Sequence, residues 1–163
     1  MNDAIKDFRL PRYHEIPDVG LFLEQTVKYI NSYLEPLGCM EITSSMISNY
    51  VKKGYINRPV KKQYNKEQIA CLFFMAIAKN ILTMENIHAM LKLQKDLYEN
   101  EKAYNYFCDH FEDMLFYIFG LKEEGNTEIV DKEEKKMLRS LIIAAAHTIY
   151  LNSCLVKKEE DPQ

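Results

Sequence analysis

The side chains best suited to chemistry in this sequence are cationic, and they gather in one stretch. Between Ile42 and Lys66 there are six basic residues and no acidic residue. The net charge of the whole chain is only −3, so the average conceals a local excess of positive charge. Phosphate oxygens are the natural partners of such a stretch, which makes DNA the first candidate ligand. The six residues are Lys52, Lys53, Arg58, Lys61, Lys62 and Lys66.

The first part of this stretch predicts a short helix of the size that enters a major groove. Hydroxyl residues open it, and hydroxyls together with free backbone N–H groups at a helix start bind phosphate well. Asn49 can make the paired hydrogen bonds that recognise adenine, and Ser48 can contact either base. We expect a recognition helix at about 43–53 and a basic wing at 57–64 that contacts phosphates. The candidate DNA-binding residues are Thr43, Ser44, Ser45, Ser48, Asn49, Tyr50, Lys52, Lys53, Arg58, Lys61, Lys62 and Tyr64.

Two other interpretations of the basic stretch stay open. Lysine is common on protein surfaces, so the stretch can be the solvated face of a helical bundle. The same scaffold can also be a helical interaction module that binds a protein and not DNA. Double-stranded DNA is the preferred partner, because Tyr50, Tyr55 and Tyr64 are interleaved with basic residues that no acid offsets.

Local signals divide the N-terminal half into an arm and two helices. Phe8–Asp18 contains two prolines and is expected to be an ordered arm rather than a helix. Asp18 is a plausible N-cap for the first helix, whose apolar residues recur at helical spacing as far as Leu34. Thr43 is expected to cap the second helix, and Gly54 to follow its end.

The rest of the chain predicts further helices. Asn65 and Gln68 have the spacing of a capping box, and Thr83 begins the next helix. Two longer helices are expected over Tyr104–Phe119 and roughly Lys132–Val156. The prediction is an all-α (mainly α) fold of about six helices, with a C-terminal helical hairpin or bundle and one short wing.

Charge divides the chain into two expected domains. Residues 1–98 contain 13 lysines and arginines against 10 acidic residues, a balance of +3, whereas residues 99–163 contain 8 against 14, a balance of −6. We expect a DNA-binding domain with its arm over 1–98 and an acidic helical domain over 99–163.

The acidic half has more apolar residues than a single inward helix face needs. Two interpretations compete for them: a homodimer interface, or a pocket for a small apolar or aromatic effector. The dimer is preferred because DNA-binding helix-turn-helix proteins are usually symmetric dimers. The candidate residues are Phe116, Tyr117, Phe119, Leu141, Ile142, Ala145 and Ile149.

Nothing in the sequence favours an enzyme or a metal site. It has no nucleophile elbow, no glycine-rich phosphate loop and no H-E-x-x-H motif. Cys108-Asp109-His110 is the one place where metal ligands adjoin, but successive helical residues point about 100° apart and do not converge on one ion. We therefore expect no catalytic residue, no metal and no cofactor.

Cysteine usage and hydropathy bear on location. The four cysteines are widely spaced and form no C-x-x-C motif, which is typical of reduced cytosolic thiols. The longest apolar run, Leu141–Val156, is interrupted by polar residues and is shorter than a membrane span. We expect a cytoplasmic protein with no membrane partner.

The basic stretch and the residues after it resemble the winged helix-turn-helix domain of the MerR regulators. In that family the recognition helix leads into a glycine, a proline, a wing and a tyrosine, and then into a helix with a leucine-rich face. Tyr50–Ile56, Pro59 and Tyr64 follow this order here, and Ile69, Leu72 and Phe73 follow them. The resemblance covers about Glu41–Leu91 and implies a recognition helix in the major groove with a wing beside it.

A second resemblance covers more of the chain. Leu10–Val19, Leu21–Thr26, Ile42–Lys52 and Pro59–Ile69 are similar to a bacterial family described as domain of unknown function eighteen thirty-six, which is regarded as MerR-like. This resemblance implies a bacterial cytosolic transcriptional regulator. It implies no ligand and no operator sequence.

Overall fold

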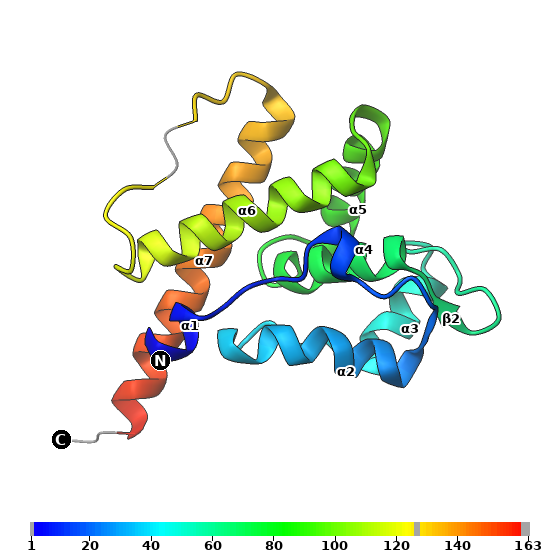
Figure 1. The fold of residues 1–163 in the computed structure, drawn as a ribbon, viewed down its shortest axis with the longest axis horizontal. Coiled ribbons are helices and arrows are strands. Elements are labelled where there is room, and N and C mark those ends of the chain that lie inside the picture. Colours follow the sequence, from blue (N-terminus) through cyan, green and yellow to red (C-terminus); the bar gives the residue numbers. More distant parts are fainter. Residues whose placement is uncertain (1, 126–127, 161–163) are drawn as a thin grey trace.

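The computed structural model of the protein describes residues 2–125 and 128–160 and is mainly α, which confirms the predicted fold class (Figure 1). Within these residues there are seven α-helices, two 3-10 turns and one two-stranded sheet. In chain order they are α1 (Asn2–Lys6), η1 (Tyr13–Glu15), β1 (Leu21–Phe22), α2 (Leu23–Leu34), η2 (Glu35–Leu37), α3 (Ser44–Lys52), β2 (Gln63–Tyr64), α4 (Lys66–Ala78), α5 (Met84–Leu97), α6 (Asn100–Ile118) and α7 (Glu133–Glu160).

Helix α4 forms the centre of the core. It is apolar on nearly all sides, and side chains such as Phe73 and Ala76 have no exposed surface. A helix of this composition needs cover all round, and α2, α5, α6 and α7 all contact it. The predicted capping box at its start is confirmed: the Gln68 N–H donates to Asn65 Oδ1 at 2.9 Å, and the Asn65 N–H donates to Gln68 Oε1 at 2.8 Å.

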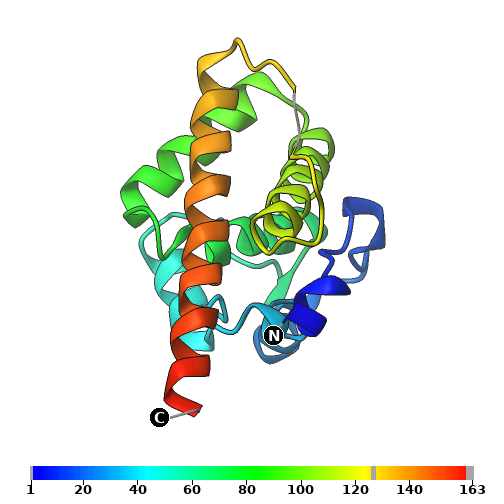
Figure 2. The ribbon, with the colours of Figure 1, turned by 90° about the vertical axis from the view of Figure 1, so that its left-hand side faces the viewer.

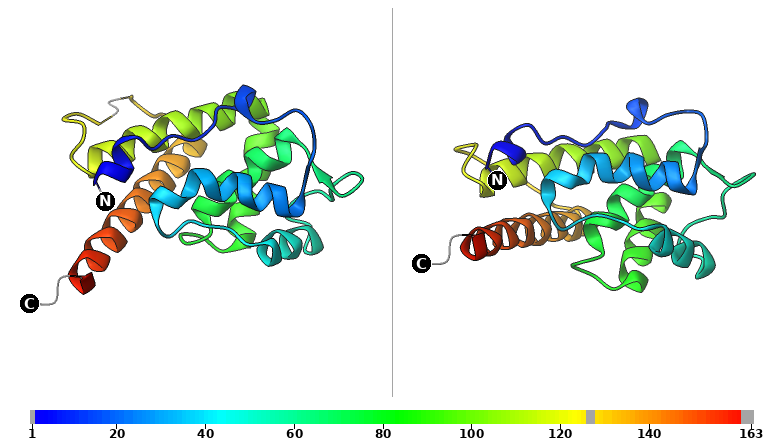
Figure 3. Two further views of the ribbon diagram at one scale, coloured as in Figure 1. Left: turned by 60° about the horizontal axis from the view of Figure 1, so that its bottom comes forward. Right: turned by 90° about the horizontal axis from the view of Figure 1, so that it is seen from below.

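Helices α6 and α7 pack together and point toward the same end of the molecule (Figures 1 and 3). The two helices therefore form a crossed pair, which is the bundle and not the hairpin of the two expected arrangements. One face of α7 is buried against the core, and Leu141, Ala145 and Ile149 lie on it. Its C-terminal end extends past the rest of the protein, as Figure 2 also shows.

Helix α7 is also long and apolar enough to be compared with a membrane-spanning helix. Within the described chain, Glu133–Lys157 is one stretch long and apolar enough, by length and composition, to cross a membrane. Part of this stretch is the core-facing surface of α7, because Ile142, Ala145 and Ala146 are buried inside the protein.

The N-terminal arm is ordered, as its prolines predict, and it runs along α6 (Figure 3). Its chain then pairs β1 antiparallel with β2, with Leu21 opposite Tyr64 and Phe22 opposite Gln63. Gly20 lies so close to this partner strand that a Cβ there would be 2.6 Å from the Cβ of Gln63. The strand pair fixes the arm to the segment that follows α3.

This pairing explains why the first helix begins later than Asp18. Residues 21–22 are held as a strand, so α2 starts at Leu23, with Phe22 at the N-cap position. The Asp18 carboxylate instead pairs with Lys66 Nζ at 2.8 Å. The prediction that Asp18 caps the helix was wrong. The pairing of β1 with β2 delays the start of α2 to Leu23, and the Asp18 side chain binds Lys66 instead.

The expected boundary between residues 98 and 99 falls at the turn that joins α5 and α6. One hydrophobic core extends across that turn: Phe74 of α4 packs edge-on against Phe107 of α6, with ring centroids 5.1 Å apart. The two charge-defined halves therefore share a core.

Candidate nucleic-acid interface

Helix α3 turns one face to the core and the other to solvent. Ile47 and Tyr50 are buried. Ser45, Ser48 and Asn49, together with Lys52, are exposed. Because positions three and four apart share a helix face, these four residues form one polar strip. The strip carries hydrogen-bonding groups and one positive charge, which are the groups used to contact base edges and phosphates.

Both ends of α3 follow the capping signals. At the start, Thr43 Oγ1 accepts a hydrogen bond from the Met46 N–H at 3.2 Å. At the end, Gly54 has a φ of +78°, and its N–H donates to the Val51 carbonyl at 3.1 Å while the Tyr55 N–H donates to the Tyr50 carbonyl at 2.9 Å. This paired arrangement satisfies the last carbonyls and turns the chain sharply toward the wing.

The wing is a short hairpin whose tip consists of two lysines. The Val60 N–H donates to the Gln63 carbonyl at 3.1 Å, and the Gln63 N–H donates to the Val60 carbonyl at 2.9 Å. Lys61 and Lys62, between them, both have left-handed backbone conformations and exposed side chains. The base of the wing is held by Gln68, whose Nε2 donates to the Asn57 carbonyl at 3.0 Å. The lysines therefore project from an anchored ribbon.

Two of the tyrosines that were expected to contact DNA are buried. Tyr50 and Tyr64 are each 4% exposed and belong to the core, and burial raises the pKa of both phenols. Tyr50 faces inward from α3, and Tyr64 lies in the strand that pairs with Leu21. We therefore correct the expectation that they contact DNA. Their rings pack in the core and hold α3 and the wing in place.

The start of α3 is less available to phosphate than the sequence suggested. Ser44 Oγ donates to Glu24 Oε1 of α2 at 3.2 Å. A carboxylate beside a helix N-terminus is itself stabilised by the helix dipole, so Glu24 competes with a phosphate oxygen for the Ser44 hydroxyl. Thr43 and Ser45 are exposed without this carboxylate contact, although the Thr43 hydroxyl already accepts the hydrogen bond that caps α3.

The charges of the surface are otherwise largely unpaired. Among the described residues, no ion pair involves Lys52, Lys53, Arg58, Lys61 or Lys62. Lys66 differs, because it is paired with Asp18. One carboxylate borders the far end of α3: Glu85, whose pKa is lowered chiefly by a backbone hydrogen bond and also by a hydrogen bond from the Tyr55 hydroxyl and the nearby Lys53.

The expected dimer or effector residues are mostly part of the core. Phe119, Leu141, Ile142, Ala145 and Ile149 are at most 6% exposed, so they pack within the chain and the expectation of a partner-facing surface there is corrected. Phe116 is half-buried and Tyr117 is exposed. The sequence prediction failed because it assumed that α6 and α7 cover only each other, whereas α7 also contacts α4 and α5.

The exposed apolar side chains of α7 lie nearer its end. Leu151, Leu155 and Val156 are between 47% and 59% exposed. Leu151 and Leu155 are four residues apart and share one helix face. Their spacing was visible in the sequence, but only the position of the core shows that this end of α7 is uncovered.

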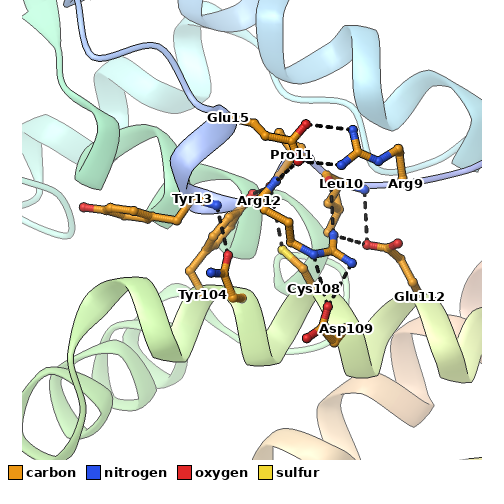
Figure 4. Close-up of polar contacts among 11 residues, drawn as sticks. Arg9, Leu10, Pro11, Arg12, Tyr13, Glu15, Tyr104, Cys108, Asp109 and Glu112 are labelled. Atoms are coloured by element: carbon orange, nitrogen blue, oxygen red, sulfur yellow. Dashed lines mark hydrogen bonds and ion pairs between the residues drawn. The ribbon is translucent and has the colours of Figure 1, made fainter.

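A cluster that the sequence did not predict binds the arm to α6 (Figure 4). Arg12 donates to Glu112 through Nη1 and pairs with Asp109 Oδ1 at 2.9 Å through Nη2. The Tyr104 hydroxyl donates to the Pro11 carbonyl at 2.7 Å. The residues share no sequence motif, because they come from segments about a hundred positions apart.

The same cluster shows how Cys108-Asp109-His110 is arranged. Cys108 is fully buried beside the arm, Asp109 faces Arg12, and the His110 ring lies against Tyr106 with centroids 3.9 Å apart. Burial raises the pKa of the Cys108 thiol to about 12, so the thiolate that metals and electrophiles require is disfavoured. In the part of the chain that the structure describes, no group of three histidine, cysteine, aspartate or glutamate residues is arranged to hold a metal ion.

Comparison with known proteins gives a family and no function. The family model described as Domain of unknown function (DUF1836) matches residues 11–107, which is more than half of the chain and includes the arm, α3, the wing and α4. No curated protein and no solved structure matches the chain. From the arm to the middle of α6, the chain therefore carries the domain that defines this family, and it belongs to the DUF1836 family.

Proposed function

We propose that this protein is a DNA-binding transcriptional regulator that reads DNA with α3 and holds the backbone with the wing. The observation that carries the proposal is the outward strip of α3, formed by Ser45, Ser48, Asn49 and Lys52, together with the two exposed lysines of the wing tip. A short helix that presents amide and hydroxyl groups beside a cationic ribbon has the parts that base and phosphate contacts need.

The arrangement also supports a MerR-like winged helix-turn-helix. Helices α2 and α3 pack together, the wing follows α3 directly, and its return strand pairs with the strand before α2. In the proposed complex α3 lies in the major groove, and the side chains of Lys52, Lys53, Lys61 and Lys62 contact phosphates beside it. The start of α3 contributes no phosphate contact, because Glu24 is placed there.

We include a homodimer in the proposal but place its contact at the end of α7. Leu151, Leu155 and Val156 are exposed there, and soluble monomers seldom leave neighbouring large apolar side chains without cover. Two copies of α3 would then read two half-sites, as is usual for helix-turn-helix dimers. The wing and this end of α7 lie at opposite ends of the molecule (Figures 1 and 3), so the dimer contact leaves the wing accessible.

A second candidate, a protein-binding module without DNA affinity, is favoured by the same exposed apolar end of α7. The two functions differ in what they require of α3. Recognition of a DNA base requires the side-chain amide of Asn49. Binding of a protein partner to α7 does not involve this residue.

Selection from a random pool of double-stranded DNA tests the proposal. Wild-type protein should enrich a defined motif, and Asn49→Ala should lose preference at one position of it, at a cost of roughly 1–3 kcal/mol there. Asn86→Ala is the matched control, because Asn86 is exposed on α5, outside the strip of α3, the wing and the proposed dimer contact. No enrichment by folded wild-type protein would reject DNA reading and leave the protein-binding module.

A further inference from the structure

A large groove lies between the wing base and the helices behind it. Its volume is about 680 Å³, which is within the usual range of roughly 300–1,000 Å³ for small-molecule sites. Its walls come from α4, α5, α6 and the first turns of α7, and its remaining side is formed by Gly54–Arg58, the segment that joins α3 to the wing. The groove is thus distinct from the outer surface of α3.

The floor of the groove is apolar. Phe74 and Phe107 pack edge-on at its base. Met90 and Leu91 line the α5 side, and Leu138 lines the α7 side. Phe74 and Phe107 are buried, whereas Met90, Leu91 and Leu138 are packed against the core and only partly covered. Water in contact with them would be released by an apolar ligand, and this release favours binding.

The rim of the groove is cationic although the protein is acidic. Five lysine or arginine residues line the groove against two carboxylates, Glu67 and Glu134. Glu67 is paired with Lys95 at 3.6 Å, and Glu134 accepts a hydrogen bond from the Tyr98 hydroxyl at 2.7 Å. Among the described residues, no ion pair involves Arg58, Lys92 or Lys102. The rim therefore has cations to offer to an anionic group.

We propose that this groove binds a carboxylic acid with an apolar tail. The tail lies on the floor against Met90, Leu91 and Leu138, and the carboxylate lies at the rim beside lysines such as Lys102. An apolar floor with a few placed charges at the edge is the usual composition of a small-molecule site. A ligand of this class contacts the apolar floor with its tail and the cationic rim with its carboxylate. A neutral or cationic amphiphile makes only the apolar contacts.

The second half of the proposal rests on the proposed function and concerns regulation. Because Gly54–Arg58 forms one wall, a bound ligand touches the segment that positions the wing relative to α3. A ligand that favours one wing position shifts the population of DNA-binding molecules, and DNA must change ligand affinity by the same factor. We expect the ligand to change DNA affinity by about fivefold or more, the lower end of ordinary coupling between sites.

Binding can be tested with dodecanoate as the probe, at concentrations where it is monomeric. The chain contains no tryptophan, so Met137→Trp, at the edge of the groove, introduces a single reporter. Its fluorescence should change with saturation in the micromolar range, and Leu121→Trp, at an exposed position outside the groove, should not respond. Calorimetry on wild-type protein measures the same binding without the reporter.

Charge is tested by comparing ligands and variants. Dodecan-1-ol and dodecylammonium should bind at least tenfold more weakly than dodecanoate. Lys102→Glu should weaken dodecanoate by a similar factor and leave dodecan-1-ol unchanged, and Lys157→Glu, which is exposed outside the groove, should behave as wild type. Equal binding of all three amphiphiles, equal responses of the two tryptophan reporters, or absence of heat with dodecanoate would overturn the site.

The two proposals can fail separately. DNA binding without dodecanoate binding would reject the groove as a carboxylate site and leave the proposed regulator intact. Dodecanoate binding by a protein that does not bind DNA would support the site and reject both its regulatory role and the proposed function. Binding of both with no change in DNA affinity would reject the coupling alone.

Discussion

Lys61 and Lys62 occupy the two central positions of the wing turn, and both have left-handed backbone conformations, with φ of 51° and 64°. A two-residue hairpin turn with this backbone favours Asn-Gly, because L side chains rarely adopt positive φ. A non-glycine residue in this region costs on the order of 1 kcal/mol or more. The tip thus has two cations where an uncharged pair would fit the backbone better.

Replacing this pair should make the protein more stable and weaken its binding to DNA. We expect Lys61→Asn with Lys62→Gly to raise the free energy of unfolding by about 1–2 kcal/mol, because the strain is relieved. The same variant should lose affinity roughly uniformly over DNA sequences, because phosphate contacts do not depend on the bases. Urea unfolding and fluorescence anisotropy measure the two effects. Lys61→Arg with Lys62→Arg should keep both wild-type values, and unchanged DNA affinity in the Asn-Gly variant would remove the wing from the interface.

Two of the ion pairs of the arm should differ in strength. Arg12 pairs with Glu112, whose side chain is 12% exposed, whereas Arg9 pairs with Glu15 near the surface. Arg12→Ala leaves a mostly buried carboxylate unpaired and should cost roughly 2–4 kcal/mol. Arg9→Ala should cost less than about 1 kcal/mol, as exposed pairs do. Chemical unfolding of both variants measures this, and equal costs would contradict the role of Arg12 in fastening the arm to α6.

Glu15 should make part of the stability depend on pH. The hydrogen bond from Arg9, together with one from the Arg12 N–H, lowers the pKa of Glu15 to about 2. A folded-state pKa below the unfolded value of about 4.3 means that the ionised form stabilises the fold at higher pH. This stability is lost as pH falls from about 4.5 toward 2.

Glu15→Gln removes that charge and keeps one acceptor oxygen for the hydrogen bonds from Arg9 Nη2 and the Arg12 N–H. The variant should be slightly less stable than wild type at neutral pH, by less than about 1 kcal/mol since the pair is solvent-exposed. The difference should shrink toward zero between pH of about 4.5 and 2. Unfolding midpoints across this range measure it. A difference that is the same at every pH would show that the Glu15 charge does not contribute.

The end of α7 should control association. Leu151→Lys with Leu155→Lys removes exposed apolar surface and should convert a dimer to a folded monomer, because these side chains contribute little to the core. Ile142→Glu should instead unfold the protein, since Ile142 is 2% exposed. Sedimentation at micromolar concentration with circular dichroism separates the two results. Wild-type protein that sediments as a 19.2 kDa monomer would contradict the dimer.

The sequence predicted the parts of the fold that depend on local contacts. Thr43 and Thr83 accept hydrogen bonds from the first turns of α3 and α5 as expected, and Gly54 ends α3 in the left-handed conformation. A cap needs only residues three or four positions apart, so its signal is complete within a short stretch.

The errors arose where distant segments meet. The start of α2 depends on the pairing of Phe22 with Gln63, and the burial of Tyr64 follows from the same sheet. Whether Ile142 faces a partner or the core depends on α4 and α5, which pack against α7 from elsewhere in the chain. The candidate groove was missed for the same reason, because its walls combine the wing base with four helices.

A salt titration of binding to duplex DNA tests the central claim most directly. If Lys52, Lys53, Lys61 and Lys62 contact phosphates in both copies of a dimer, about eight charges are neutralised and the slope of log affinity against log salt should be near −7. The Lys61→Asn, Lys62→Gly variant should flatten that slope by about two per copy. Folded wild-type protein with no affinity for DNA in about 50 mM salt, or with affinity that does not change with salt, would contradict the account.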